Sequence, residues 1–80
     1  MKLKVKLFAG LRRCAPLGAR EGEFEVEVPG ERPTVADLLR LVRVPEQAVA
    51  VVMVNGMVAP RSSSLEEGAE VSIFPPLAGG

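Results

Sequence analysis

The sequence predicts a two-layer α+β domain, with a mixed sheet of about four to five strands packed on one main helix. Three observations predict it. Two segments near the start alternate strictly between charged and apolar residues, one later segment has helical spacing, and three further strand signals follow it. A chain of 80 residues has room for a single small core, so all of these elements belong to one domain.

The two alternating segments are residues 2–7, where lysines alternate with apolar residues, and residues 23–28, where glutamates do. This period of two predicts half-buried strands. Antiparallel pairing would set the lysines opposite the glutamates, and a slip by one residue would bury these charges, so the charges favour one register. The connecting segment predicts a helical turn over residues 11–15 that ends at Pro16 and Gly18.

The helix signal begins at Thr34, a candidate N-cap with Asp37 three residues later. Pro45 stops the helix from continuing. One apolar stripe follows the cap at helical spacing, made of Val35, Leu38, Leu39 and Val42. The stripe predicts that this helix covers one face of the sheet.

Residues 49–54 form a continuous apolar run, which predicts a strand covered on both faces, with Met53 in the core. Asn55-Gly56 predicts a tight turn into a short strand at residues 57–58. Residues 70–74 alternate again, with Val71 and Ile73 inward. The order strand, strand, helix and three strands, with a right-handed crossover, predicts a β-grasp domain over residues 1–74 and an extended tail over residues 75–80.

Composition excludes several classes of function. Equal numbers of basic and acidic residues give a net charge of +0, without the basic footprint of a nucleic-acid or membrane-surface protein. With no His and one Cys, the chain lacks a His/Cys metal site, a Ser–His or Cys–His catalytic pair and an internal disulfide. We expect no bound cofactor, a reducing cytoplasmic setting and a packing role for Cys14.

The tail is the unusual element, because two prolines lead to Leu77 and a final Gly79-Gly80. Glycines need no side-chain clearance, so such an end could enter the active site of a partner. The α-carboxylate has a pKa of about 3.3–3.7, so it is ionised and a poor electrophile. A reactive tail would therefore need activation by another protein, for example as an acyl-adenylate.

Strand parity puts Phe8 on the face of the lysines, and Phe74 on the face of Glu70 and Ser72. If the first and last strands are parallel neighbours, both rings lie at one end of the sheet, beside the tail. An exposed aromatic pair there predicts a docking patch. The alternatives are rings that only cover strand ends, or a bulge that reverses the parity.

The ending FPPLAGG, reached through EEGAEVSI, together with VNG and the early KLFAGLRR, resembles the MoaD/ThiS sulfur-carrier family, above all the small subunits of molybdopterin synthase. The resemblance covers essentially the whole chain. It implies a ubiquitin-like fold with no catalytic side chains of its own. It also implies that an E1-like adenylyltransferase uses ATP to adenylate Gly80, which then becomes a thiocarboxylate.

The resemblance further implies a hetero-oligomer with a MoaE-type large subunit, where the sulfur goes to a pterin precursor of the molybdenum or tungsten cofactor. The expected partner-binding residues are Phe8, Val58, Phe74, Pro75, Pro76 and Leu77. Ala69 stands where the family usually has an acidic residue, and residues 58–62 look more like ThiS. The alternatives are therefore delivery for thiazole synthesis or to another sulfur acceptor, a ubiquitin-like protein modifier, and an interaction module with an inert tail.

Overall fold

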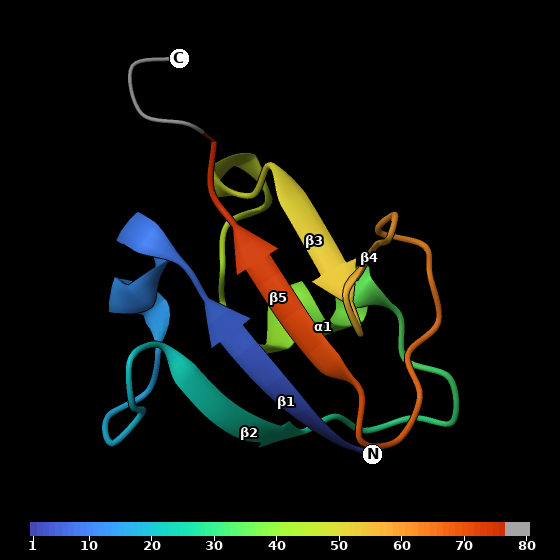
Figure 1. Ribbon diagram of the computed structural model, residues 1–80. Helices are drawn as coiled ribbons and strands as arrows, with labels where there is room; N and C mark the ends of the chain where they lie inside the picture. Colours follow the sequence, from blue (N-terminus) through green and yellow to red (C-terminus); the bar gives the residue numbers. More distant parts are fainter. Residues whose placement is uncertain (77–80) are drawn as a thin grey trace.

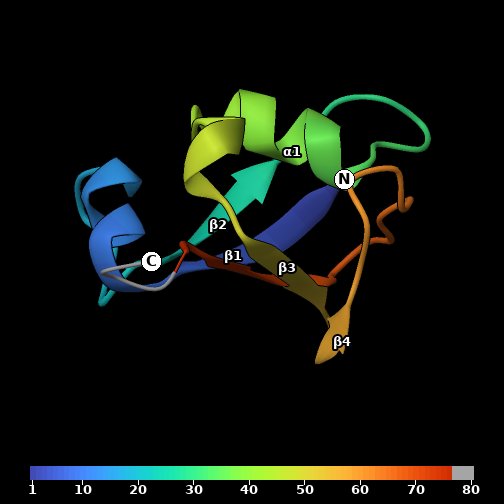
Figure 2. The same cartoon turned by 90° about the horizontal axis from the view of Figure 1, so that it is seen from above.

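The computed structural model describes residues 1–76 and has two layers, a five-stranded sheet and one α-helix packed on one of its faces (Figures 1 and 2). The strand order is β2-β1-β5-β3-β4. The strands are β1 (Lys2–Leu7), β2 (Glu23–Glu27), β3 (Val51–Val54), β4 (Met57–Val58) and β5 (Glu70–Phe74). The helices are α1 (Val35–Leu41) and two short 3-10 helices, η1 (Ala9–Cys14) and η2 (Glu46–Ala48). The predicted α+β class and β-grasp arrangement are confirmed.

The charged strands pair in the predicted register. β1 and β2 are antiparallel, with Lys4 opposite Glu25 and Lys6 opposite Glu23. The Lys6 ammonium lies 3.9 Å from the Glu23 carboxylate. Such exposed pairs contribute about 1 kcal/mol or less each, so their main effect is on register. On its other side β1 pairs in parallel with β5, which is the arrangement of a β-grasp sheet.

The core lies between the sheet and α1, and it uses the inward residue of each alternating pair. The largest fully buried side chains are Leu3, Leu7, Leu38, Leu39, Ile73, Val5, Val35, Val52 and Val71. Burying one such side chain stabilises the fold by about 1.5–3 kcal/mol. The helix stripe is therefore inward as predicted, except that Val42 is the C-cap and only half-buried.

The start of α1 is fixed by a complete capping box. The Thr34 hydroxyl accepts a hydrogen bond from the Asp37 amide at 3.2 Å, and the Asp37 carboxylate accepts one from the Thr34 amide at 2.9 Å. The Thr34 amide, followed by its hydroxyl, lowers the pKa of Asp37 below its ordinary value of 3.8. The predicted helix start is confirmed.

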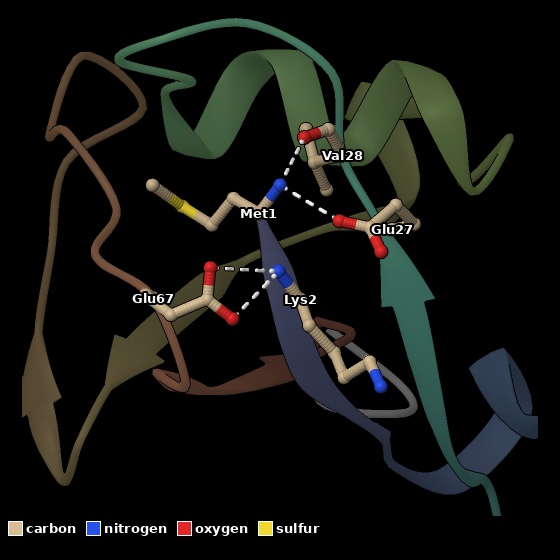
Figure 3. Close-up of polar contacts among 5 residues, drawn as sticks. All are labelled: Met1, Lys2, Glu27, Val28 and Glu67. Atoms are coloured by element: carbon tan, nitrogen blue, oxygen red, sulfur yellow. Dashed lines mark hydrogen bonds and ion pairs between the residues drawn. The ribbon is translucent and has the colours of Figure 1, made fainter.

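The end of the sheet at the start of β1 is held by polar contacts (Figure 3). The amino group of Met1 donates hydrogen bonds to Glu27 Oε2 at 2.8 Å and to the Val28 carbonyl at 3.0 Å. The Lys2 amide donates to both carboxylate oxygens of Glu67, at 3.1 and 3.2 Å. The hydrogen bond from the Met1 ammonium lowers the pKa of Glu27. These contacts tie β1 to β2 and to the loop before β5.

One predicted element differs in its environment. The apolar run was expected to form a strand covered on both faces, but β3 spans Val51–Val54 and only its helix-facing side is covered. Val51 is 38% exposed, and Met53 lies half-buried on the face without the helix, so the predicted core position of Met53 is wrong. The physical reason is that α1 covers one face of the sheet, and nothing else in residues 1–76 covers the other (Figure 2).

The turn after β3 is confirmed. Asn55 and Gly56 have positive φ angles of 51° and 86°, as a two-residue hairpin turn requires. It returns the chain to β4 at the edge of the sheet. Within residues 1–76, no helix is long and apolar enough to cross a membrane.

Candidate functional site

Phe8 and Phe74 are stacked on the helix-free face of the sheet. Their ring centroids are 4.3 Å apart and their planes differ by 14°. The parallel pairing of β1 and β5 produces this contact, because Lys6 lies beside Ser72 and the Phe8 amide donates to the Ile73 carbonyl at 3.1 Å. The predicted neighbourhood of the two rings is therefore confirmed, and the bulge that would have reversed their parity does not occur.

The stacked rings line an apolar groove. Its volume is about 890 Å³. Its lining includes Phe8, Ala50, Val51, Met53, Phe74, Pro75 and Pro76. The pairing of Val51 with Phe74, and of Met53 with both Ser72 and Val58, places these side chains on the face of the rings. We define the apolar patch as Phe8, Val51, Met53, Val58 and Phe74.

The chain leaves β5 at this groove. The Ala50 amide donates to the Phe74 carbonyl at 2.8 Å, which fixes the end of β5 against the start of β3. Pro75 and Pro76 continue along the groove, and proline restricts the backbone and removes its amide donor. The segment that leads to the terminal glycines thus starts beside the stacked rings.

The predicted partner-binding residues are brought together to different degrees. Phe8, Phe74, Pro75 and Pro76 line the groove. Val58 lies at the edge of the same face and is 73% exposed. Leu77, and the predicted reactive residues Gly79 and Gly80, lie outside the described residues. That these residues bind a partner or react stays a prediction.

Sequence reasoning missed Ala50, Val51 and Met53 as parts of this surface. It placed the apolar run inside the core, because an uninterrupted apolar strand is typical of a sheet covered on both faces. The signal that could have found them is the number of helices, since a single short helix covers only one face of the sheet.

The helix-free face is divided by charge. Over β1, β2 and the start of β5 it carries the alternating lysines and glutamates together with Glu70. Over β3, β4 and the end of β5 it carries the apolar patch, which Phe8 joins just after β1. The Lys6 ammonium lies 5.8 Å from the centroid of the Phe8 ring, at the boundary between the two halves. An apolar centre with a charged rim is the usual composition of a protein–protein interface.

In residues 1–76 no group of three or more His, Cys, Asp or Glu side chains could hold a metal ion. Cys14 is a free thiol, half-buried against the core beside Phe24 and Val26, as expected of a packing residue. The apolar patch is therefore the strongest candidate site in the described part of the chain.

Comparison with known proteins identifies the family. The family model described as the ThiS family matches residues 5–80. The structure of SAMP1 from Haloferax volcanii, a small archaeal modifier protein, is 29% identical, covers 100% of both chains and has a TM-score of 0.75. A putative molybdopterin converting factor, subunit 1, from Pyrococcus furiosus is 29% identical over 95% of this chain and 98% of that chain, with a TM-score of 0.74.

A more distant structure shares the fold. In a complex of subunits 1 and 2 of the molybdopterin-converting factor from Helicobacter pylori 26695, the matching chain is 19% identical over 100% of both chains, with a TM-score of 0.63. The comparison with curated protein sequences gives no significant match. The family model covers nearly the whole chain, and the chain therefore belongs to the ThiS family of ubiquitin-fold sulfur carriers and modifiers, to which MoaD-type proteins are related.

Proposed function

We propose that this protein is a sulfur carrier whose Gly80 carboxylate is activated by an E1-like adenylyltransferase. The carboxylate attacks the α-phosphate of ATP and pyrophosphate leaves, which gives an acyl-adenylate. A sulfur nucleophile then displaces AMP and leaves a thiocarboxylate. The support is that the family model extends through residue 80 and so includes Gly79-Gly80.

The acceptor that we propose is a pterin precursor, within a MoaE-type large subunit of molybdopterin synthase in the cytoplasm. The observation that carries this proposal is the apolar groove at the start of the tail, whose lining includes Phe74, Pro75 and Pro76. A partner that covers the apolar patch would receive the tail at a fixed position. The similarity to the Pyrococcus furiosus protein supports this acceptor class.

The stacked rings suit the role of an anchor. Aromatic side chains that are held in place before binding lose little conformational freedom, and they dominate the energy of many interfaces. Phe74 ends β5 and Phe8 directly follows the neighbouring strand β1, where its amide bonds to the Ile73 carbonyl, so the sheet fixes both stacked rings. Val51, Met53 and Val58 extend the same apolar surface across β3 and β4.

A protein-modifier function is the second candidate. The equal identity of 29% to the Haloferax volcanii modifier favours it. In that case the activated Gly80 would be transferred to the amine of a target lysine instead of to sulfur. A third candidate, delivery of sulfur for thiazole synthesis, uses the same terminus and differs only in the acceptor protein.

Calorimetric titration against a MoaE-type large subunit and, in parallel, against a thiazole synthase tests the acceptor. We expect tight binding to the large subunit, weakened by Phe74→Ala by about 2 kcal/mol or more, as is usual for an aromatic hot spot. Lys2→Gln is the matched control. Lys2 lies at the start of β1, whereas Phe8 directly follows the end of the same strand, so Lys2 is far from the apolar patch. Binding to the thiazole synthase alone would refute the pterin acceptor, and binding that is insensitive to Phe74→Ala would refute the docking surface.

A further inference from the structure

β2 is an edge strand of the sheet, and within residues 1–76 no other strand pairs with its outer side. The Val28 amide donates to the Met1 carbonyl at 2.7 Å and the Leu7 amide donates to the Gly22 carbonyl at 3.0 Å, so the even-numbered residues of this segment face β1. Because backbone groups alternate in direction along a strand, the amides and carbonyls of residues 23, 25 and 27 face outward. The Glu23 amide donates to the Arg20 carbonyl at 2.8 Å, and the Arg20 amide donates to the Glu23 carbonyl at 3.2 Å. Within residues 1–76, the outward groups of Glu25 and Glu27 have no backbone partner.

A second groove runs along this edge on the helix side of the sheet. It has a volume of about 250 Å³, and its lining comes from β2, the end of α1 and the end of η1. Its apolar lining comes from Cys14, Pro16, Phe24, Val26, Leu41 and Val42. Leu41 is the last residue of α1 and is 42% exposed. Phe24 and Val26 are only half-buried. The edge therefore has open apolar side chains next to open backbone groups.

The opposite face of β2 is acidic. Glu23, Glu25 and Glu27 point to the helix-free face, and all three are exposed. β1 shows which sequence complements this strand, because its lysines lie opposite these glutamates while its apolar residues lie on the face of Phe24 and Val26. The outer edge offers the same arrangement to a strand that pairs from the other side.

We propose that the outer edge of β2 binds an extended segment of a partner protein in which basic and apolar residues alternate, added to the sheet as a further strand. The backbone of the segment pairs with the outward groups of Glu25 and Glu27. Its basic side chains lie beside the glutamates, and its apolar side chains enter the groove next to Leu41. The proposal goes beyond the carrier function and does not rest on it, because β2 contributes no residue to the apolar patch and its outer edge faces away from β1 and the other strands.

Charge argues against two other occupants. A second copy of the chain that paired through β2 would set one row of glutamates against another, and like charges directly opposite destabilise a strand pair. A segment of the opposite parity would place its basic side chains against the apolar lining of the groove, whose only charged members are Glu25 and Arg43, and its apolar side chains beside the row of glutamates. The edge therefore selects for basic residues on one face of the incoming strand only.

The test is a titration of the isotopically labelled full chain, followed by NMR, with the capped peptide Lys-Val-Lys-Leu-Lys-Val-Lys. The control peptide has the same composition in blocks, Lys-Lys-Lys-Lys-Val-Leu-Val. We expect only the alternating peptide to shift the signals of Phe24, Glu25 and Leu41, and to slow hydrogen exchange at the amides of Glu25 and Glu27. Analytical ultracentrifugation of the free chain should show a monomer at the same concentration.

Substitutions locate the site. Glu25→Lys and Leu41→Lys change exposed or partly exposed positions, and each should weaken binding of the alternating peptide about tenfold. Val58→Lys, at the other edge of the sheet, should leave the affinity unchanged. Equal binding of both peptides, signal changes centred on the apolar patch, or a Glu25→Lys variant with unchanged affinity would overturn the proposal. Self-association through β2 would overturn it in favour of a second copy.

Discussion

Replacing Phe74 by alanine separates a surface aromatic residue from a core residue. Phe74 lies half-buried on the helix-free face and stacks on Phe8 at 4.3 Å between centroids, and the preceding residue, Ile73, is 0% exposed on the opposite face. Truncation of a core Phe costs about 3–5 kcal/mol. At Phe74 the cost should be smaller, about 1–2 kcal/mol, because a stacked pair contributes about 0.5–1.5 kcal/mol and solvent can occupy the vacated space.

The assay is urea denaturation of the wild type, Phe74→Ala and the matched control Ile73→Ala. Ile73→Ala should lower the free energy of unfolding by about 2–5 kcal/mol, since it leaves a cavity between the sheet and α1. A double-mutant cycle with Phe8→Ala should give a coupling energy of about 0.5–1.5 kcal/mol for the stack. If Phe74→Ala destabilises the protein as much as Ile73→Ala does, the placement of Phe74 outside the core is wrong.

Three further predictions concern other positions. Gly22 has a φ of 81°, and an added Cβ would lie 2.4 Å from a backbone oxygen of β1, so Gly22→Ala should lower the free energy of unfolding by more than about 1 kcal/mol. Gly68→Ala should cost less, because φ is 80° there but the surrounding space is open, and thermal denaturation compares the two variants. The pKa of Asp37 is lowered in the folded protein, so the stabilising effect of its carboxylate is present above the ordinary pKa of 3.8 and is lost as the pH falls through the folded pKa. The free energy of unfolding of Asp37→Asn should therefore differ most from that of the wild type near neutral pH and approach it in acid. Denaturation curves whose difference stays the same at all pH values would contradict this. Cys14→Ser should cost about 1 kcal/mol in stability and retain sulfur transfer, whereas loss of transfer in the folded variant would make the thiol a sulfur relay.

Local patterns in the sequence predicted most of the fold. The alternation of lysines and glutamates predicted both early strands and their register, because the charges are compatible with only one face. Thr34 and Asp37 predicted the start of α1, since each side chain satisfies a backbone amide of the other residue. Asn55-Gly56 predicted the hairpin, because both residues tolerate positive φ.

The environment of the apolar run was not predicted, although a single helix covers only one face of the sheet. An uninterrupted apolar run results from burial on both faces and also from an apolar surface on the open face, so Val51 and Met53 were placed in the core when they line the groove. The groove along β2 was missed for a related reason. Leu41 lies next to the apolar stripe of the helix but is not part of it. Because α1 ends at Leu41, the side chain is left 42% exposed.

The most direct test of the carrier function is the intact mass of the chain after incubation with ATP, a cognate E1-like enzyme and a sulfur donor. We predict a mass increase equal to the exchange of one oxygen for sulfur, located at Gly80. A chain without Gly79 and Gly80 should keep nearly the same thermal stability, because two terminal glycines have no side chain to bury, and it should remain unmodified. A thiocarboxylate on the truncated chain, conjugates of high mass without any thiocarboxylate, or no modification of the full chain would contradict the account.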